Sequence, residues 1–321
     1  MKDFDKINPI FYISEDNKNI IKNIEKNLSL IKIENSIKKN LQIKSRVRSI
    51  YSSLAIEENT LSLNSIENII ENKLVLGSRK EIQEVKNANE LYEHIDDYNW
   101  KSEEDFLKAH TVLMRYFDDD NGYYRNHGEG IKKDDEIIYM ASNSLVVPSL
   151  MESLFEYING NDLHPIILAS IFHYYFVTIH PFSDGNGRLA RFWVTLILTD
   201  WNKKFEYIPI EEEIYLNQEE YYNSIAQCHI NGNANIFISF MLKIINSSLE
   251  KTTQKTTQKL NKNQIKILEY INENPSITRN ELAKKLNITP DGVKYNLKKL
   301  IDNNFIERIG SDNGGYWNIR K

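Results

Sequence analysis

The stretch from His180 to Arg191 reads HPFSDGNGRLAR, and the apolar run FWVTLIL follows it directly. This order predicts a loop that leads into the N-terminus of a buried helix. The first N–H groups of that helix, and the positive end of its dipole, would then face an anion bound at the loop. The stretch is therefore a candidate phosphate-binding site.

The residue types within the stretch suit a polyphosphate. Gly185 and Gly187 let the backbone approach an anion without a Cβ in the way, and Asn186 can donate through its side-chain amide. Arg188 and Arg191 lie three residues apart and share a helix face. Their forked donors match a di- or triphosphate.

Two further residues bring chemistry to the same stretch. Asp184 is a hard oxygen ligand that can hold Mg²⁺ between two phosphates. His180 has an ordinary pKa near neutrality and can take a proton from an attacking hydroxyl. The plainer alternative is a loop in which Asp184 caps a helix and the arginines are solvated. Agreement at eight informative positions in twelve argues against it, and neither the Walker pattern nor the dinucleotide-binding glycine pattern is present.

The stretch resembles the H-x-F-x-D/E-G-N-G-R-x-x-R signature of the Fic (Fido) family at every fixed position. The resemblance implies a protein adenylyltransferase, which moves AMP from ATP to a Ser, Thr or Tyr hydroxyl of a target protein and releases pyrophosphate. It implies that His180 is the base and that Asp184 carries Mg²⁺. The implied phosphate-binding residues, from the α- to the γ-phosphate, are Gly185, Asn186, Gly187, Arg188 and Arg191.

A second motif lies upstream, in residues 41–58, where apolar residues recur at helical spacing. Ser53 and Glu57 lie four apart on one face of the predicted helix, and composition alone favours a solvated acidic end. Many Fic proteins, however, have an inhibitory helix with the pattern S/T-x-x-x-E-G/N. The resemblance implies that Glu57 pairs with Arg191 and competes with the γ-phosphate; Glu58 stands where the family has Gly or Asn.

A hairpin is predicted around Asp134–Asp135, with residues 136–140 as its return strand. It resembles the Fic flap, which aligns the target segment as an added strand; an ordinary surface hairpin is the alternative. Residues 141–143 replace the proline pair that often follows the flap. The same resemblance places Ile138 and Tyr139 among the residues that contact ATP.

The segment from Glu219 to Asn233 resembles the family helix that closes the adenine pocket. Tyr221 and His229 are its candidate nucleoside contacts. For an aromatic residue at helical spacing, a packing role is the alternative.

The tail from residue 262 is predicted to be a separate unit of three helices and a two-stranded hairpin. It resembles a winged helix-turn-helix domain. Residues 251–321 hold 14 Lys and Arg against 7 Asp and Glu, a net charge of +7, whereas the rest of the chain has −12. DNA binding and protein contacts both fit this tail. The candidate DNA-binding residues are Lys294, Tyr295, Lys298 and Lys299.

We therefore expect a mainly α protein: a helical Fic core with a β-hairpin flap, plus a small α+β winged-helix domain. Helices are expected at 104–117, 147–158, 164–179, 187–199, 218–230 and 234–248. The expected division of the chain is an N-terminal helical region over 1–103 that includes the inhibitory helix at about 42–58, a catalytic domain over 104–248, a linker or helix end over 249–261, and the winged helix over 262–321.

Composition narrows the function classes. The 321 residues contain one cysteine, Cys228, so no internal disulfide is expected, and neither a membrane span nor a signal peptide is predicted. A cytoplasmic protein fits these observations. Three hypotheses stay open: an adenylyltransferase restrained by Glu57, a DNA-binding regulator that senses nucleotide, and an enzyme that removes AMP. The expected partners are ATP, Mg²⁺ and a target protein or the chain itself, with DNA and a homodimer as further options.

Overall fold

The computed structural model describes residues 6–31, 38–117, 120–128, 130–133, 136–257, 261–302, 305–310 and 314–319. For residues 130–133, 136–140, 253–257 and 302 it describes the backbone alone. The chain divides into two compact units. The larger unit comprises residues 1–30 and 41–250, and the smaller unit residues 31–40 and 251–321.

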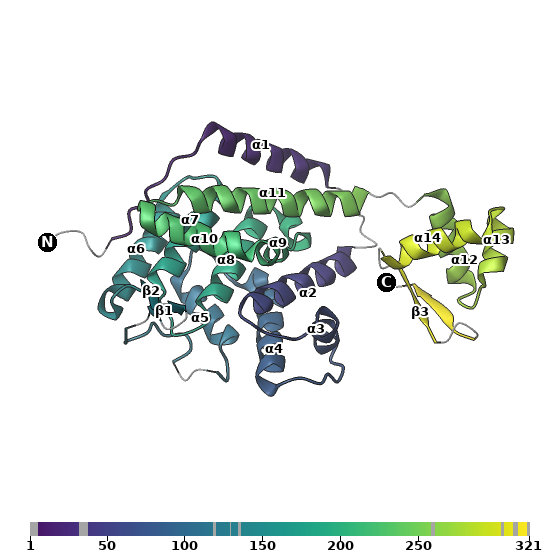
Figure 1. The fold of residues 1–321 in the computed structure, drawn as a ribbon, viewed down its shortest axis with the longest axis horizontal. Helices are drawn as coiled ribbons and strands as arrows, with labels where there is room; N and C mark the ends of the chain where they lie inside the picture. The colour runs from purple at the N-terminus through teal and green to yellow at the C-terminus, as the bar shows by residue number, and fades with distance from the viewer. Residues whose placement is uncertain are drawn as a thin grey trace. The chain divides into compact units, whose positions relative to one another are not determined.

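The larger unit is built from helices, as expected (Figure 1). The helices that lie wholly or mostly in it are α1 (Glu15–Leu30), α2 (Lys38–Ile56), α3 (Leu63–Ile70), α4 (Arg79–Glu93), α5 (Glu103–Leu113), α6 (Val147–Gly160), α7 (Pro165–Ile179), α8 (Asn186–Trp201), α9 (Ile210–Leu216), α10 (Gln218–Asn231) and α11 (Asn235–Thr257), with short 3-10 turns at Ile95–Asp97, Ser144–Val146 and Lys203–Tyr207. The expected hairpin is present as β1 (Gly130–Lys133) paired antiparallel with β2 (Glu136–Met140). Its tip, Asp134–Asp135, lies outside the described residues.

Helices α7 and α8 lie at the centre of the larger unit. Most side chains of both helices are buried, because their sequences are apolar around most of the circumference. Phe106 of α5 packs edge-on against Phe172 and Phe176 of α7 and against Trp193 of α8, with ring centroids 4.9 to 5.8 Å apart. This aromatic cluster fixes α5 and α7 against α8, and so fixes the loop that joins α7 to α8.

Helix α2 is fastened to the core by a buried carboxylate, Glu211 of α9, which is 1% exposed. Three hydroxyl groups donate to it: Ser49 of α2 at 2.6 Å, Tyr92 of α4 at 2.8 Å and Thr195 of α8 at 2.7 Å. Hydrogen bonds of this kind satisfy a carboxylate that would otherwise be costly to bury. They also tie four helices together at one point.

Helix α2 ends two residues before the expected position. The N–H groups of Glu58 and Asn59 donate to the carbonyls of Ala55 and Leu54, and Glu58 has a left-handed backbone with φ of 66°. This pair of bonds is the Schellman motif that ends helices. Glu57 therefore lies on the closing turn and not inside the helix. The left-handed position is the one where the family pattern has Gly or Asn, which adopt it at low cost.

Two other helix boundaries differ from expectation. Helix α5 ends at Leu113 and not at 117, because the side-chain amide of Asn87 donates to the carbonyls of Leu113 and Arg115 and draws the chain out of the helix. Helix α11 continues to Thr257, so the segment expected as a linker from residue 249 is helical that far. Among the described residues, no helix combines the length and apolar character needed to cross a membrane.

The smaller unit has the expected three helices and hairpin: α12 (Lys262–Glu273), α13 (Arg279–Leu286), α14 (Pro290–Asp302), β3 (Ile306–Ile309) and β4 (Tyr316–Ile319). Capping boxes begin α12 at Asn261 and α13 at Thr278. The helices enclose a core of aliphatic side chains with Trp317, whose indole N–H donates to the carbonyl of Ile277. The fold class is therefore confirmed for both units.

The Glu211 cluster generates the first prediction. Glu211→Ala leaves three buried hydroxyl groups without their acceptor and should lower the free energy of unfolding by about 3 kcal/mol. Urea denaturation measures this loss. Glu212→Ala is the matched control, because Glu212 pairs with Arg48 in a half-exposed position and should change stability by less than about 1 kcal/mol. Equal losses in the two variants would contradict the structural role of Glu211.

Candidate functional site

The loop between α7 and α8 begins with a left-handed residue. His180 caps the C-terminus of α7 with φ of 52°, and its N–H donates to the carbonyl of Phe176 at 2.9 Å. A non-glycine residue adopts this conformation only where its surroundings hold it. The turn directs the chain away from α7 and buries Phe182 fully in the aromatic cluster.

Arg125, just before the flap, supplies part of that support. It is 3% exposed, and its Nε donates to the carbonyl of His180 at 2.6 Å. Its other nitrogens donate to the carbonyls of His127 and Ser142 at 2.6 and 2.5 Å. The backbone N–H of Arg125 donates to Pro181. One planar guanidinium thus joins the two ends of the flap segment to the His180 backbone.

His110 of α5 holds the loop from the other side. Its ring stacks on Phe182 with centroids 3.6 Å apart. Its Nδ1 accepts from the backbone N–H of Gly122 at 2.9 Å, so Nε2 holds the ring proton and donates to the carbonyl of Asp184 at 3.0 Å. The tautomer follows from the fixed donor of Gly122. His110 therefore connects the flap segment to the loop residue proposed to bind metal.

Asn186 takes a different part from the one expected. Its side-chain oxygen accepts from the N–H of Phe182 at 3.1 Å, and its side-chain nitrogen donates to the carbonyl of Phe182 at 2.8 Å. Both ends of the amide are thus occupied within the loop, and the side chain is 3% exposed. Asn186 therefore shapes the loop, and its expected contact with phosphate stays a prediction.

The N-terminus of α8 has the geometry of an anion site. Gly185 is the N-cap with φ of 81°, and the first bond of the helix runs from the N–H of Leu189 to the carbonyl of Gly185. The N–H groups of the residues between them have no partner within the helix, and the helix dipole adds positive charge there. A Cβ on Gly187 would overlap the Oε1 of Glu57. The Glu57 carboxylate thus lies over this N-terminus.

Arg191 lies beneath that carboxylate and is 1% exposed. Its Nε donates to the hydroxyl of Ser53 at 3.0 Å, and its Nη2 donates to the carbonyl of Ser53 at 2.9 Å and to Oε1 of Glu57 at 2.7 Å. Burial disfavours the charge of Arg191, but the attraction of Glu57 outweighs it and raises the pKa of the guanidinium. The closing turn of α2 therefore occupies the donors of Arg191.

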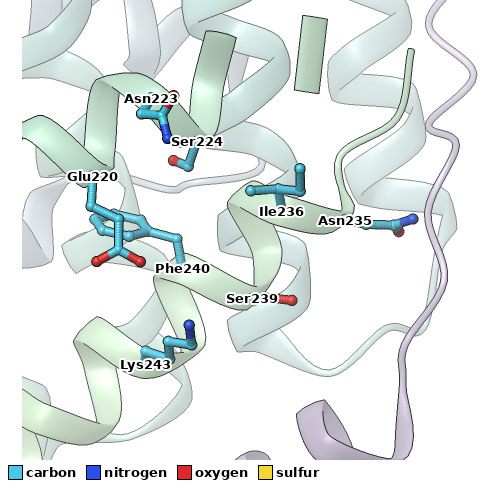
Figure 2. Close-up of a pocket in the computed structure, with 8 residues that line it drawn as sticks. All are labelled: Glu220, Asn223, Ser224, Asn235, Ile236, Ser239, Phe240 and Lys243. Atoms are coloured by element: carbon cyan, nitrogen blue, oxygen red, sulfur yellow. The ribbon is translucent and has the colours of Figure 1, made fainter. Parts of the chain in front are cut away.

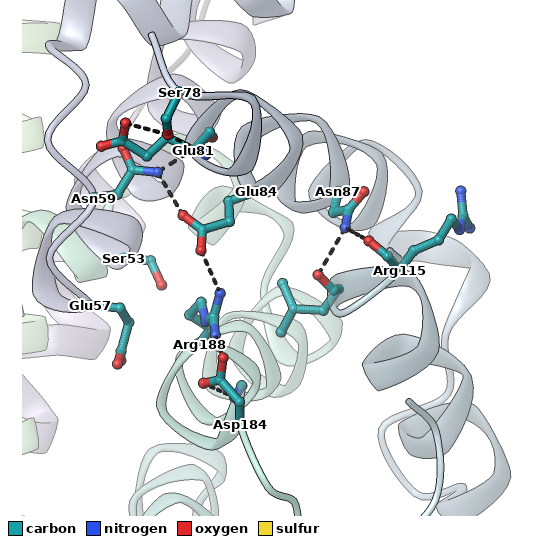
Figure 3. Close-up of polar contacts among 12 residues, drawn as sticks. Ser53, Glu57, Asn59, Ser78, Glu81, Glu84, Asn87, Arg115, Asp184 and Arg188 are labelled. Atoms are coloured by element: carbon teal, nitrogen blue, oxygen red, sulfur yellow. Dashed lines mark hydrogen bonds and ion pairs between the residues drawn. The ribbon is translucent and has the colours of Figure 1, made fainter. Parts of the chain in front are cut away.

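Arg188 lies between two carboxylates, as Figure 3 shows. Its Nη2 is 2.7 Å from Oδ2 of Asp184, and its Nη1 is 3.5 Å from Oε1 of Glu84 on α4. The side chain is 6% exposed, and its Nε is buried with no hydrogen-bond partner among the described residues. A buried guanidinium with a donor to spare fits a ligand that supplies further oxygen atoms.

Asp184 is suitably placed to hold a cation. Partial burial raises the pKa of its carboxyl, but Arg188 and the N–H of Gly185 outweigh that effect and lower the pKa, so the group is ionised near neutrality. Its side chain is 57% exposed. No cluster of three or more acidic, His or Cys side chains occurs among the described residues. A lone carboxylate that shares its ion with substrate phosphates is the usual arrangement for Mg²⁺.

Tyr221 lies behind Arg191 and not in an open pocket. It is 2% exposed, and its hydroxyl shares a hydrogen bond of 2.9 Å with Nε2 of His173. Burial and the nearby Arg191 lower the pKa of His173 to about 3, so its ring is neutral. Tyr221 therefore packs in the core, which was the alternative to its predicted contact with the nucleoside. His229 lies beside Tyr174, at 3.4 Å from that hydroxyl. The side chains of Ile138 and Tyr139 lie outside the described part of the structure.

A shallow hollow between α10 and α11 is separate from these residues (Figure 2). It is lined by Glu220, Asn223, Ser224, Asn235, Ile236, Ser239, Phe240 and Lys243. The predicted site residues do not line it. Its charged side chains, Glu220 and Lys243, come from different helices, and we assign it no role.

Sequence reasoning missed three residues of this site: His110, Arg125 and Glu84. Each lies 55 or more residues before its partner, which is in the loop for His110 and Arg125 and on α8 for Glu84. No local sequence pattern marks His110, two turns into its helix, or Arg125, which follows two tyrosines.

Comparison with known proteins places the site in a family. The sequence profile of the Fic/DOC family matches residues 100–198, and the profile described as winged helix-turn-helix DNA-binding matches residues 260–307. The crystal structure of a Fic family protein from Desulfovibrio desulfuricans G20 is 32% identical, with 98% of each chain covered and a TM-score of 0.76. The chain belongs to the Fic family.

Two curated relatives are named as enzymes. The probable protein adenylyltransferase aq_aa38 of Aquifex aeolicus is 29% identical over 124 residues, which are 37% of this chain and 38% of that protein. The protein adenylyltransferase Fic of Nematostella vectensis is 34% identical over 95 residues, 30% of this chain and 21% of that protein. The similarity thus spans well under half the length of either relative.

Arg125 generates the second prediction. Arg125→Lys keeps the charge but cannot span the carbonyls of His127, Ser142 and His180, so it should lower the free energy of unfolding by about 2 kcal/mol. Arg115→Lys is the control, because the bidentate Arg115–Glu90 pair is about 40% exposed and should matter by less than about 1 kcal/mol. Urea denaturation of both variants makes the comparison. An Arg125 variant as stable as the control would refute the proposed support of the loop.

Proposed function

We propose that this protein is a protein adenylyltransferase that transfers AMP from ATP to a Ser, Thr or Tyr hydroxyl of a target protein. The observation that carries the proposal is the arrangement of the His180–Arg191 stretch. Its helix N-terminus and two buried arginines form a polyphosphate site directly after a histidine that can act as a base. The names of the curated relatives support the same activity.

The residues divide the reaction in a physically consistent way. His180 takes the proton of the target hydroxyl, whose oxygen forms a bond to the α-phosphorus of ATP. The bond from the α-phosphorus to the bridging oxygen breaks, and pyrophosphate leaves with the electron pair. The α8 N–H groups, Arg188 and Arg191 balance the phosphate charge. Mg²⁺ held by Asp184 would neutralise charge on the phosphates when bound.

We further propose that Glu57 restrains this activity. Its carboxylate occupies the Arg191 donor and the space over Gly187 that a phosphate would need. A carboxylate and a phosphate compete for the same forked donor. ATP would then bind in an unproductive pose until Glu57 is displaced.

The third prediction tests both statements. Glu57→Gly should raise the transfer of label from α-³²P-ATP to protein by at least about tenfold, because it removes one charged hydrogen bond that ATP must replace. The variant should fold, since Arg191 keeps both of its bonds to Ser53. Adding His180→Ala should abolish the label while ATP binding persists.

Glu58→Gly is the matched control. It removes an adjacent exposed carboxylate and relieves a left-handed backbone, so it should not activate the enzyme. ATP binding by the Glu57 variant without any transfer would favour the nucleotide sensor instead. Loss of AMP from a previously modified protein, dependent on Glu57, would favour the reverse reaction.

We also propose that the smaller unit binds DNA. The match to a DNA-binding winged-helix profile supports this, as does the exposure of Lys294, Tyr295 and Lys298 on α14. The ammonium of Lys299 lies 5.9 Å from the centre of the Tyr295 ring. Exposed cations and an aromatic side chain on the third helix are the means by which such domains contact the duplex.

The fourth prediction follows from this charge. The full chain should bind a labelled mixed-sequence DNA duplex with a micromolar Kd at moderate salt, as measured by fluorescence anisotropy. Lys294→Ala with Lys298→Ala should weaken binding about tenfold and reduce the slope of log Kd against log salt by about two. Lys22→Ala with Lys26→Ala makes the same charge change on α1 and should have little effect. Equal effects of the two pairs would contradict a specific role of α14.

A further inference from the structure

Glu84 of α4 lies between the motif arginine and the turn that holds Glu57 (Figure 3). Its Oε2 accepts from the side-chain nitrogen of Asn59 at 2.8 Å, and its Oε1 is 3.5 Å from Nη1 of Arg188. The side chain is 12% exposed. A nearly buried carboxylate with two partners from different segments couples the positions of both segments.

Asn59 belongs to the closing turn of α2, residues 57–60, which we call the Glu57 turn. The N–H of Asn59 donates to the carbonyl of Leu54, and its side-chain oxygen accepts from the N–H of Leu61. Asn59 thus holds the end of the turn through bonds to neighbouring residues of the chain, and Glu84 of α4 holds the side chain of Asn59. The Glu57 carboxylate is only two residues away.

The first turn of α4 holds the next residue in the same manner. Glu81 accepts from the N–H and the hydroxyl of Thr60 at 2.8 and 2.7 Å. Its bonds from Ser78 and then from Thr60 lower the pKa of its carboxyl to about 2. Glu81 is exposed to solvent, however, so this contact is weaker than the one made by Glu84.

The contact between Glu84 and Arg188 opposes the binding of ATP. Asp184 and Glu84 both face the guanidinium of Arg188. Two carboxylates are therefore already paired with the cation that a polyphosphate would need. A phosphate that draws Arg188 toward itself must separate it from Glu84. Negative charge on Glu84 therefore opposes phosphate binding at this arginine.

We propose that Glu84 is a positioning residue that couples the Glu57 turn to Arg188. Through Asn59 it holds the turn, and with it Glu57, over Gly187; through its other oxygen it holds Arg188 away from phosphate. Binding of ATP and release of the turn then favour each other, because release of the turn removes Glu57 from the phosphate site, and a phosphate that draws Arg188 away from Glu84 loosens the carboxylate that holds Asn59. The inference rests on the proposed function and extends it to a residue outside the motif.

The fifth prediction uses Asn59→Ala, which cuts the link between Glu84 and the turn. In the chain with Glu57, it should lower the Kd for ATP with Mg²⁺ about tenfold, as measured by isothermal titration calorimetry, because one charged hydrogen bond no longer holds the competing carboxylate. In the Glu57→Gly background it should change the Kd by less than about twofold. A merely structural residue would act equally in both backgrounds.

Glu84→Gln provides the second variant. Its side-chain oxygen can still accept from Asn59, but the charge beside Arg188 is gone, so in the Glu57→Gly background the Kd for ATP should fall about threefold. Glu90→Gln is the matched control. Glu90 lies on α4, as Glu84 does, and its carboxylate also pairs with an arginine, Arg115. It should leave the Kd unchanged within about twofold in both backgrounds.

The outcomes separate the inference from the proposed function. Equal effects of Asn59→Ala in both backgrounds, or an unchanged Kd with Glu84→Gln, would overturn the role of Glu84. If Glu57→Gly transfers no label while the Kd values follow the predicted pattern, the adenylyltransferase function fails and the coupling stands. If label transfer rises in Glu57→Gly and the pattern is absent, the function stands and the coupling fails.

Discussion

Arg191 is a guanidinium buried at the centre of the larger unit, and its need for hydrogen-bond acceptors shapes the whole site. It lies on the core helix α8 and is 1% exposed. Leaving such a charge without partners would be strongly destabilising. Ser53 and Glu57 of the α2 terminus supply the partners. The polar end of α2 and its closing turn therefore supply the partners of a core arginine, and they lie over the proposed phosphate site.

The same requirement explains why the surrounding contacts converge. Glu211 of α9 holds helix α2 at Ser49. Glu84 and Glu81 of α4 hold its closing turn. The loop is held at His180 by Arg125 and at Asp184 by His110. Carboxylates pair with both arginines of the motif, and a backbone carbonyl accepts a further bond from Arg191. Under the proposed function, substrate binding is an exchange of anions at these two arginines.

Local patterns in the sequence were sufficient for much of this fold. The twelve residues from His180 to Arg191 predict a loop and a buried helix because apolar side chains follow the glycines at once. Two helices of the smaller unit, α12 and α13, begin at capping boxes whose two residues lie three positions apart in the sequence. Contacts that join distant segments were out of reach. Arg125 and Glu84 show this, since nothing near either residue reveals that one binds the carbonyl of His180 and the other Arg188.

The space beside Gly187 is needed both by the Glu57 carboxylate and by a phosphate at the α8 N-terminus. The Glu57 carboxylate needs the space where a side chain would begin, and so would a phosphate approaching the α8 N-terminus. A larger residue there would exclude both, so no substitution at this position can remove the carboxylate and still leave room for an anion. A change that displaces the carboxylate alone must arise in α2, in its closing turn or in the residues that support them. Under the proposed restraint, selection can therefore adjust how tightly Glu57 is held without altering the His180–Arg191 motif.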